Sequence, residues 1–521
     1  VTRLKDGVRI LKSPTPLGPY VRSVGTWLVA WAQRAPDRVF LAERDGAGQW
    51  RRVTYAETLA AVRRIGQALL ARKLNAERPV VILSDNSIHH GWLTLAAMNV
   101  GVPVAPVSPA YSLLSKDFAK LKHVLGLVNP GLIYVSDGAK FGDALRAANV
   151  SKAEVVVEAN PPTGMASTPF SALLASEATA AVDAAFAAVG PDTLAKILFT
   201  SGSTGMPKGV INTQRMLCSN QEALRQVWPF LLEVPPVLVD WLPWNHTYGG
   251  NNNVHSILAN GGSLYIDEGK PAPGLIERTV ANLRDVSPTV YQNVPRGFDI
   301  LLPFLERDAA ARRSLFRDLS VIVYAGAALP QHLWTRLEAL AVRETGRRIV
   351  MVSAWGSTET APMATMVHYP IDRAGVVGLP VPGVEVKLVP NGDKLEMRVR
   401  GPNVTPGYWK SPELTKAAFD ADGFYCIGDA GRFVDPENPA LGLEFDGRIA
   451  EDFKLTTGTW VHVGALRVRA IAAAAPVAQD VVVTGHDRAE IGLLIFPNPA
   501  GIRTLCPDLP PDAPLSAMIG R

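Results

Sequence analysis

The stretch "LFTSGSTGMPKGVIN", Leu198 to Asn212, decides how the rest of the chain is interpreted. A short apolar run ends abruptly in glycine, serine and threonine, and Pro207-Lys208-Gly209 closes the loop. Glycines let backbone N–H groups point inward, hydroxyls donate hydrogen bonds and a lysine adds charge, so this composition suits a phosphate group. Small polar residues are also common in turns, so the stretch alone allows a plain turn. It is not a Walker P-loop, because Gly209 follows Lys208 and the glycines are wrongly spaced.

The segments around this loop alternate between strand-like and helix-like patterns. "TYAETLAAVRRIGQALLARKL" has apolar residues at helical spacing behind a predicted Thr54 cap, and "PVVILSDN" is typical of a buried strand. A second block begins at "LAKILFTSG" and continues through "VLVDWLPW", "VIVYAGAALP" and "RRIVMVSAWGSTE". Strands that alternate with helices predict an α/β chain, with parallel sheets covered by helices. After about Val367, short strands joined by Asn-Gly and Gly-Pro turns predict a β-barrel-like unit.

Composition excludes several classes of protein. The chain has 521 residues, 47% of them hydrophobic and 19% charged, which is ordinary for a globular protein of several domains. A net charge of +4, without a basic cluster interleaved with aromatics, argues against nucleic acid as a partner. No apolar run reaches the roughly 18 residues of a membrane-spanning helix. Three scattered cysteines and a charged N-terminus that lacks the features of a signal peptide predict a cytoplasmic location.

Five segments resemble those of one enzyme family, in the family's order. TSGSTGxPKG matches, residue for residue, the phosphate loop of the adenylate-forming enzymes, which include acyl-CoA synthetases, adenylation domains of peptide synthetases and beetle luciferases. "YAGAALP", "WGSTETAP", "YCIGDAG" and "FDGRIAEDFKLTTGTWV" are similar to later segments of the same family. Taken singly, "YAGAALP" is a buried strand and a turn, "WGSTETAP" is a capping box and "YCIGDAG" is a turn. Together the resemblance covers essentially the whole chain.

The resemblance implies the adenylate-forming enzyme fold. We expect a large N-terminal domain at 1–446, made of two α/β subdomains and a β-barrel subdomain. The subdomain boundaries are expected near residues 190 and 366, with a hinge at 447–450. A small, mobile α+β C-terminal domain is expected at 451–521.

Two features of the C-terminal part depart from the family. The family's C-terminal domain is longer and carries a catalytic lysine in a PKTxxGK-like segment, which this chain lacks, so we expect the chain to be incomplete. The family's hinge residue is usually Asp or Lys, and Ala450 stands in its place. Rotation between the two half-reactions is therefore expected at Ala450 or at its neighbours Glu451 and Asp452.

The resemblance also assigns a nucleotide site. Trp355 would stack on adenine, Thr358 would meet a phosphate, and Asp429 and Arg448 would bind the ribose. A magnesium ion would be held by Glu359 and Thr200 and would bridge phosphate oxygens. The full predicted set for ATP and AMP is Thr200, Ser201, Gly202, Ser203, Thr204, Gly205, Lys208, Gly326, Ala327, Trp355, Gly356, Thr358, Asp429 and Arg448.

The acyl site is predicted around "PWNHTYG". A lone histidine is more often structural, but His246 matches the family's histidine beside the acyl carboxylate. Trp244, Tyr248 and Gly249 complete the predicted pocket, although such aromatics suit a core equally well. His246, together with Lys208 and Glu359, is predicted to be catalytic.

The implied activity is an AMP-forming ligation in two steps. The acid's carboxylate attacks the α-phosphate of ATP, and the thiol of coenzyme A then attacks the acyl-adenylate and expels AMP. "LVDWLPWNHTYGGNNN" and "SPTVYQNVPRGFDILLP" resemble the feruloyl-CoA synthase branch, so ferulate or a related hydroxycinnamate is the predicted acid. A ligase for another aryl or medium-chain fatty acid, or a non-catalytic nucleotide-binding relative, remains an alternative. Monomer and homodimer both remain open.

Overall fold

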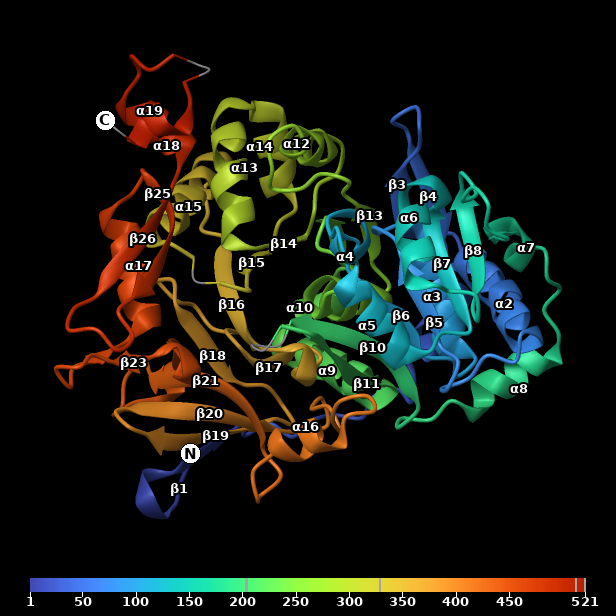
Figure 1. Ribbon diagram of the computed structural model, residues 1–521, viewed down its shortest axis with the longest axis horizontal. Helices are drawn as coiled ribbons and strands as arrows, with labels where there is room; N and C mark the ends of the chain where they lie inside the picture. Colours follow the sequence, from blue (N-terminus) through green and yellow to red (C-terminus); the bar gives the residue numbers. More distant parts are fainter. Residues whose placement is uncertain (202–204, 328, 511–512, 520–521) are drawn as a thin grey trace.

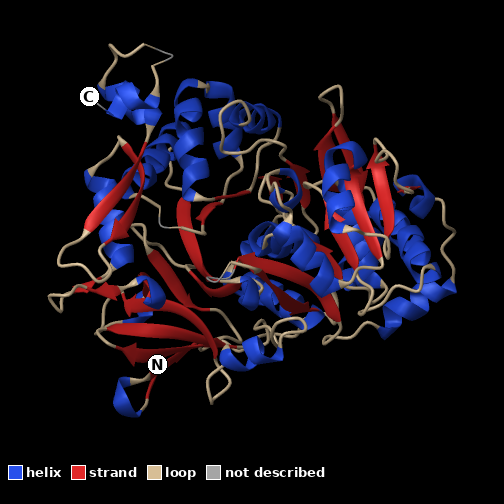
Figure 2. Cartoon of the chain, viewed as in Figure 1, coloured by secondary structure: helices blue, strands red, loops and turns tan. Residues whose placement is uncertain are grey.

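The computed structural model describes residues 1–201, 205–327, 329–510 and 513–519. Figure 1 shows layers of helices against twisted sheets, and Figure 2 shows helices and strands alternating through most of the chain. The α/β class predicted from the alternating patterns is therefore confirmed.

A seven-stranded sheet carries the phosphate-loop stretch. Its order is β11-β10-β6-β5-β7-β8-β9, and every neighbouring pair is parallel except the β10–β11 hairpin. Val80 and Ile82 pack into the cluster on one face, and Val81 and Leu83 into the cluster on the other. Burial on both faces explains why the central strands are continuous apolar runs. The strands are β5 (Val80–Leu83), β6 (Val104–Pro106), β7 (Leu132–Asp137), β8 (Glu154–Ala159), β9 (Thr168–Pro169), β10 (Leu194–Ser201) and β11 (Pro207–Thr213).

Helices cover both faces of this sheet. One face is covered by α2 (Tyr55–Ala71) and α3 (Ile88–Asn99), and the other by α5 (Ala119–Val128) and α6 (Gly138–Ala148). The predicted cap of α2 is confirmed, because Thr54 Oγ1 accepts from the Glu57 N–H at 3.2 Å. Glu57 Oε2 accepts in return from the Thr54 N–H at 2.8 Å, which completes a capping box.

An eleven-stranded sheet spans the middle and C-terminal parts of the chain. Its order is β1-β2-β19-β20-β21-β22-β18-β17-β16-β15-β14, with β14 to β16 parallel and the rest antiparallel. The predicted Asn-Gly turn joins β19 to β20, and Gly392 adopts φ +64° there. The strands are β1 (Thr2–Arg3), β2 (Arg9–Lys12), β14 (Val290–Asn293), β15 (Val321–Tyr324), β16 (Val350–Gly356), β17 (Met363–Met366), β18 (Val376–Pro380), β19 (Glu385–Asn391), β20 (Lys394–Arg400), β21 (Tyr425–Phe433) and β22 (Leu443–Arg448).

A second apolar core lies over the parallel end of the large sheet. It joins β14 to β16 with four helices, α12 (Ile276–Asp285), α13 (Pro295–Arg307), α14 (Ala309–Arg317) and α15 (Gln331–Thr345). A four-stranded sheet, in the order β12-β13-β3-β4, contains β12 (Val237–Asp240), β13 (Ser263–Ile266), β3 (Val39–Arg44) and β4 (Trp50–Thr54). The other helices up to residue 450 are α1 (Val24–Arg34), α4 (Ala110–Leu113), α7 (Phe170–Leu174), α8 (Ala180–Ala188), α9 (Gln214–Val227), α10 (Phe230–Glu233), α11 (Val254–Asn260) and α16 (Pro412–Ala417).

The last part of the chain is a small α+β unit, drawn in red in Figure 1. Two short ribbons form its strands, β23 (Phe453–Lys454) with β24 (Trp460–Val461), and β25 (Ala478–Thr484) with β26 (Gly492–Pro497). Its helices are α17 (Val463–Ala473), α18 (Pro499–Leu505) and α19 (Leu515–Ile519).

Strand pairing crosses the expected subdomain boundaries. The β10–β11 hairpin joins the sheet of the first 190 residues, β3 and β4 join strands from the middle of the chain, and β2 pairs with β19. The boundaries near 190, 366 and 446 stay predictions. Among the described residues, every helix is too short or too polar to cross a membrane.

Candidate active site

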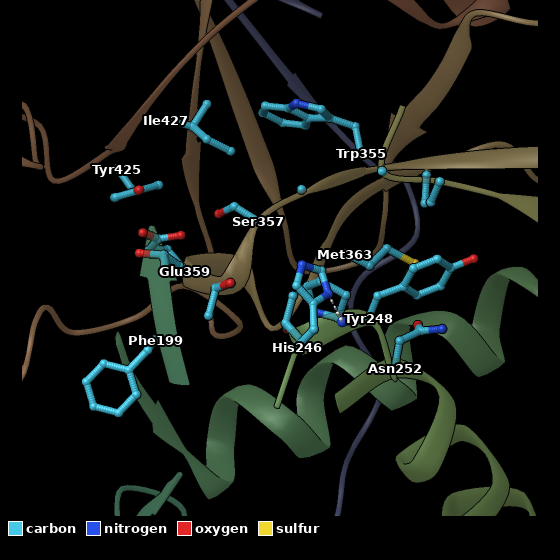
Figure 3. A pocket seen from close by; sticks show the side chains of 18 of the residues that line it. Phe199, His246, Tyr248, Asn252, Trp355, Ser357, Glu359, Met363, Tyr425 and Ile427 are labelled. Carbon is cyan, nitrogen blue, oxygen red and sulfur yellow. Dashed lines mark hydrogen bonds between the residues drawn. The ribbon is translucent and has the colours of Figure 1, made fainter. Parts of the chain in front are cut away.

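A cavity of about 810 Å³ lies between the β10–β11 hairpin, the ends of β14 to β16 and β21. Figure 3 shows Glu359 and Tyr425 on one side of it, Tyr248 and Asn252 on the other, and His246 between them. The predicted residues that line it are Thr200, Lys208, His246, Tyr248, Gly326, Trp355, Gly356, Thr358, Glu359 and Arg448. Segments that are far apart in the sequence thus meet around one space.

The β10–β11 hairpin brings the predicted phosphate residues to the cavity. Thr200 and Lys208 are partners across the hairpin. The Lys208 ammonium lies 5.2 Å from the centre of the Tyr408 ring, within the range of a cation–π contact. Tyr408 is held there because its neighbour Trp409 donates a backbone hydrogen bond to the Gly209 carbonyl at 2.7 Å. Gly202, Ser203 and Thr204 lie outside the described residues.

Glu359 presents a buried carboxylate to the cavity. The Tyr408 hydroxyl donates to Glu359 Oε1 at 3.0 Å, and the Tyr425 hydroxyl lies 3.3 Å from that of Tyr408. Burial and the charge of Glu359 raise the pKa values of both tyrosines, so their hydroxyls stay protonated. The arrangement fixes one carboxylate oxygen.

The turn that carries Glu359 is braced from outside. Asn403, which is buried, donates through Nδ2 to the carbonyl oxygens of Thr360 at 2.8 Å and Met363 at 2.9 Å. A Cβ on Gly356 would lie 1.8 Å from the Pro362 carbonyl oxygen, so only glycine permits this close approach. The local backbone therefore determines where the carboxylate points.

Trp355, Asp429 and Arg448 form a connected group at one end of the cavity. The indole Nε1–H of Trp355 donates to Asp429 Oδ2 at 2.8 Å. Asp429 and Arg448 are cross-strand partners, with Arg448 Nε 3.4 Å from Asp429 Oδ1. Burial raises the pKa of Asp429, whereas the Trp355 hydrogen bond and the Arg448 charge oppose that shift. A carboxylate next to an aromatic ring can accept hydrogen bonds from two adjacent hydroxyls.

His246 lies in the middle of the cavity, with its ring open to that space. Its Nδ1 accepts a hydrogen bond from the backbone N–H of Tyr248 at 3.2 Å, drawn as a dashed line in Figure 3. The surrounding protein shields the ring from water and lowers its pKa, so the ring is neutral. Because Nδ1 accepts a hydrogen bond, the proton of the neutral ring lies on Nε2. His246 can therefore donate one hydrogen bond into the cavity.

The far end of the cavity is largely apolar with a polar cluster. Asn252 Nδ2–H donates to Gln292 Oε1 at 3.1 Å. The Tyr248 hydroxyl is buried and has no hydrogen-bond partner among the described residues. The apolar lining residues include Pro106, Leu224, Trp228, Val323, Met363 and Met366.

Other predicted residues lie outside the cavity lining. Trp244 is buried with its ring edge against His90, at 5.2 Å between centroids, and lines a second, small cavity instead. Gly249 is buried, and a Cβ on it would lie 2.4 Å from the Leu242 carbonyl oxygen. Asp429 contacts the lining through Trp355, and Ser201 is the last residue of β10. The remaining described ones, Gly205, Ala327 and Ala450, are exposed.

Several lining residues were not singled out from the sequence. Tyr425 lies inside the quoted segment "YCIGDAG", so its position in a motif was the available signal, whereas Tyr408 lies outside the quoted segments. Asn252 lies in "LVDWLPWNHTYGGNNN" and Gln292 in "SPTVYQNVPRGFDILLP", so the resemblance of these two segments was the available signal for them.

Comparisons with known proteins agree with this geometry. The family model described as "AMP-binding enzyme" matches residues 28–409. A methyl-dioxo-octahydroindenyl propanoyl:CoA ligase of Mycobacterium tuberculosis is 30% identical over 79% of this chain and 77% of that protein. Phenylacetyl-CoA ligase epaB of Aspergillus niger is 32% identical over 45% of this chain and 43% of that protein. The crystal structure of ATP-bound MatB from Rhodopseudomonas palustris has a TM-score of 0.70 and 28% identity, over 91% of this chain and 88% of MatB. The predicted fold is confirmed.

Proposed function

The chain belongs to the AMP-binding enzyme family, and we propose that this ATP-dependent acyl-CoA ligase uses ferulate or a related hydroxycinnamate as its acid. The observation that carries the proposal is one cavity with a nucleotide-like end at Trp355 and a mostly apolar far end that Tyr248 and Asn252 line. The similar ligase epaB is named for phenylacetate, an acid with an aromatic ring.

The charge of the cavity favours an acid with one carboxylate. Among the described lining residues, the lysine and arginine side chains are Lys208 and Arg448, and both belong to the nucleotide side. A second carboxylate at the far end would lose its hydration without a cation to pair with, which is costly. A neutral ring or chain is therefore the better occupant.

Polar groups at the far end favour a ring with hydroxyl or methoxy substituents. A fatty acyl chain would leave the Asn252–Gln292 pair facing hydrocarbon. A site built to pair with a substrate hydroxyl discriminates strongly against analogues that lack it. Ferulate carries both kinds of substituent on its ring.

The proposed roles of the site residues come from the family resemblance and are supported by where their atoms lie. His246 Nε2–H would hold the acid's carboxylate between the acyl end and the nucleotide end. Asp429 and Arg448 would bind the ribose beneath the Trp355 ring, and Lys208 would face the pyrophosphate. These interactions position the two reactants and neutralise charge as the acyl-adenylate forms.

The donor set at Glu359 fits a magnesium ion. Magnesium is usually bound through one or two carboxylates together with substrate phosphates, and prefers oxygen ligands. The Tyr408 hydroxyl holds the Glu359 carboxylate toward the cavity, and Glu359 and the Thr200 hydroxyl are the protein ligands in the proposal. When bound, the ion would neutralise charge on the phosphates of ATP.

The test is a substrate panel with pyrophosphate release as the readout. The protein would be assayed with ATP, magnesium, coenzyme A and ferulate, coumarate, cinnamate, phenylacetate, octanoate or malonate. We expect the highest kcat/KM with ring-hydroxylated cinnamates, and a value on the order of tenfold lower with cinnamate. Faster turnover of octanoate or malonate would contradict the proposed acid.

An Asn252→Leu variant sharpens the panel, because it removes the amide and keeps a side chain of similar size. It should lose most of the preference for ferulate over cinnamate and retain its activity with cinnamate. Asn260→Leu is the matched control, since Asn260 is a buried asparagine of α11 that donates to the Ser256 carbonyl and lies outside the cavity lining. An unchanged preference in Asn252→Leu would show that the ring substituents bind elsewhere.

A further inference from the structure

Lys196 is a buried lysine in the middle of β10, with 2% of its surface exposed. Its ammonium donates to the Gly250 carbonyl at 2.8 Å and to Asn251 Oδ1 at 3.2 Å. No carboxylate among the described residues forms an ion pair with it, and burial lowers its pKa to about 7. A buried lysine without a counter-ion is unfavourable for folding, and an apolar side chain would be less costly there.

Both acceptors of Lys196 lie in the π-helix Tyr248–Asn253, which forms part of the acyl wall. Tyr248 and Asn252 of this segment line the large cavity. Asn251 is oriented by its own amide, which donates to Asn212 Oδ1 at 2.9 Å and Thr247 Oγ1 at 3.1 Å. Its Oδ1 is therefore turned toward Lys196.

Lys196 also belongs to the hairpin that carries the phosphate residues. It is the β-sheet partner of Asn212, and Thr200 follows four residues later on the same strand. One side chain thus connects the strand that leads to the nucleotide end with the wall of the acyl end. Reaction in line at the α-phosphate requires these two ends at a fixed separation.

The space behind the wall is not filled by side chains. A second cavity of about 20 Å³ is lined by Lys196, Gly250, His90, His255 and Trp244, among others. The ring nitrogens of His255 and the indole N–H of Trp244 have no partner among the described residues. The cavity is large enough for one water molecule. Packing beside Lys196 is therefore incomplete, and its hydrogen bonds to Gly250 and Asn251 help to hold this segment.

We propose that Lys196 is a positioning residue, which holds the wall Tyr248–Asn253 at the correct distance from the phosphate hairpin and so determines the affinity for the acid. This inference rests on the proposed placement of the acid against Tyr248 and Asn252. It concerns any acid that binds there.

The test compares Lys196→Met with the wild type, using the acid for which the wild type has the highest kcat/KM. We expect the KM for the acid to rise tenfold or more, while the KM values for ATP and coenzyme A stay within twofold. Lys387→Met is the matched control, because Lys387 is a buried lysine of β19 that pairs with Asp420 and Asp422. It should lower thermal stability and leave the KM for the acid unchanged.

Two further variants keep the inference testable. If Lys196→Met does not fold, Lys196→Gln retains a hydrogen-bond donor on a shorter side chain and should raise the KM for the acid by a smaller factor. Asn252→Ala combined with Lys196→Met should show less than additive effects on acid binding, because both act through one wall.

The outcomes separate this inference from the proposed acid. Failure of ferulate is seen with the wild-type enzyme alone, in the substrate panel. A Lys196 variant whose KM for the acid stays within twofold of wild type, or whose KM for ATP rises equally, overturns the positioning role.

Discussion

At the end of the cavity near Trp355, the positions of single side chains are determined by their hydrogen-bond and ion-pair partners. Asp429 is buried, yet it keeps a hydrogen bond from Trp355 and the nearby Arg448 guanidinium. These contacts hold the carboxylate in place before a ligand binds. The same feature makes the proposed ribose contact testable at one atom.

Asp429→Asn should raise the KM for ATP by on the order of tenfold or more, because hydrogen bonds to a charged acceptor contribute about 1.5–3 kcal/mol. The KM for the acid should stay within twofold, which serves as the internal control. The measurement is steady-state pyrophosphate release at varied ATP. An unchanged KM for ATP would remove Asp429 from the proposed nucleotide site.

His90 makes the stability of the fold depend on pH. It is 2% exposed, and burial lowers its pKa from 6.5 to about 4, although the Asp85 carbonyl opposes the shift. The unfolded chain therefore binds a proton between about pH 6.5 and pH 4 that the folded chain excludes. The contribution of the neutral His90 ring to the free energy of unfolding is fully present above pH 6.5, and it is lost as the pH drops through this window.

In His90→Gln, the free energy of unfolding should fall less as the pH is lowered, by up to about 3 kcal/mol less at pH 4. The check is the urea midpoint of unfolding measured between pH 7.5 and pH 4.5, with His332→Gln as control because His332 is exposed on α15. Parallel curves for the wild type and His90→Gln would show that the ring is not the group responsible.

At the scale of elements, the site depends on connections between segments. The turn Thr358–Thr360 places Glu359, and its position depends on Asn403, about 40 residues later in the chain. The segment around Tyr408 pairs with β11, which brings that hydroxyl to the carboxylate. The π-helix Tyr248–Asn253 is held by Lys196 in the same way.

Asn403→Ala should lower both stability and activity, because it leaves buried carbonyl groups with fewer donors. We expect a loss of about 1–3 kcal/mol in the free energy of unfolding, together with a fall in kcat. Thr54→Ala is the control, since it removes the α2 cap and costs about 1 kcal/mol without touching the cavity. If the two variants lose stability and kcat alike, the turn has no special role.

At the scale of the whole molecule, the C-terminal unit is attached to the large sheet through ion pairs. Asp452 pairs with Lys394, and the two ring nitrogens of His462 each lie 3.0 Å from a carboxylate, of Asp452 and of Asp393. Ala450 precedes this cluster in an exposed 3-10 turn, Ile449–Glu451. Rotation of the unit would have to break the Lys394–Asp452 pair and the His462–Asp393 contact, which join it to the large sheet.

Ala450→Pro should spare acyl-adenylate formation and block formation of the thioester, because proline restricts the rotation expected at this point. Adenylate formation is measured by pyrophosphate exchange, and the thioester by chromatography of the CoA product. Equal loss of both half-reactions would contradict a hinge at Ala450.

The sequence by itself determined the class of fold and predicted a phosphate segment, an adenine segment and a ribose segment. The reason is local: strand and helix periodicity, glycine-rich turns and the order TSGSTGxPKG are all properties of contiguous residues. The motifs at Trp355 and Arg448 were found in this way, and the structure brings both to one cavity.

Only the tertiary structure decided which side chains complete the site. Tyr408, Asn252 and Gln292 reach the cavity because sheet pairing joins segments that are distant in the chain, and Trp244 is turned away from it by packing against His90. Lys196 is a polar break in an apolar strand when seen in sequence. Its contacts with the π-helix exist only after the hairpin and the wall are folded together, since neither segment alone contains both the donor and its acceptors.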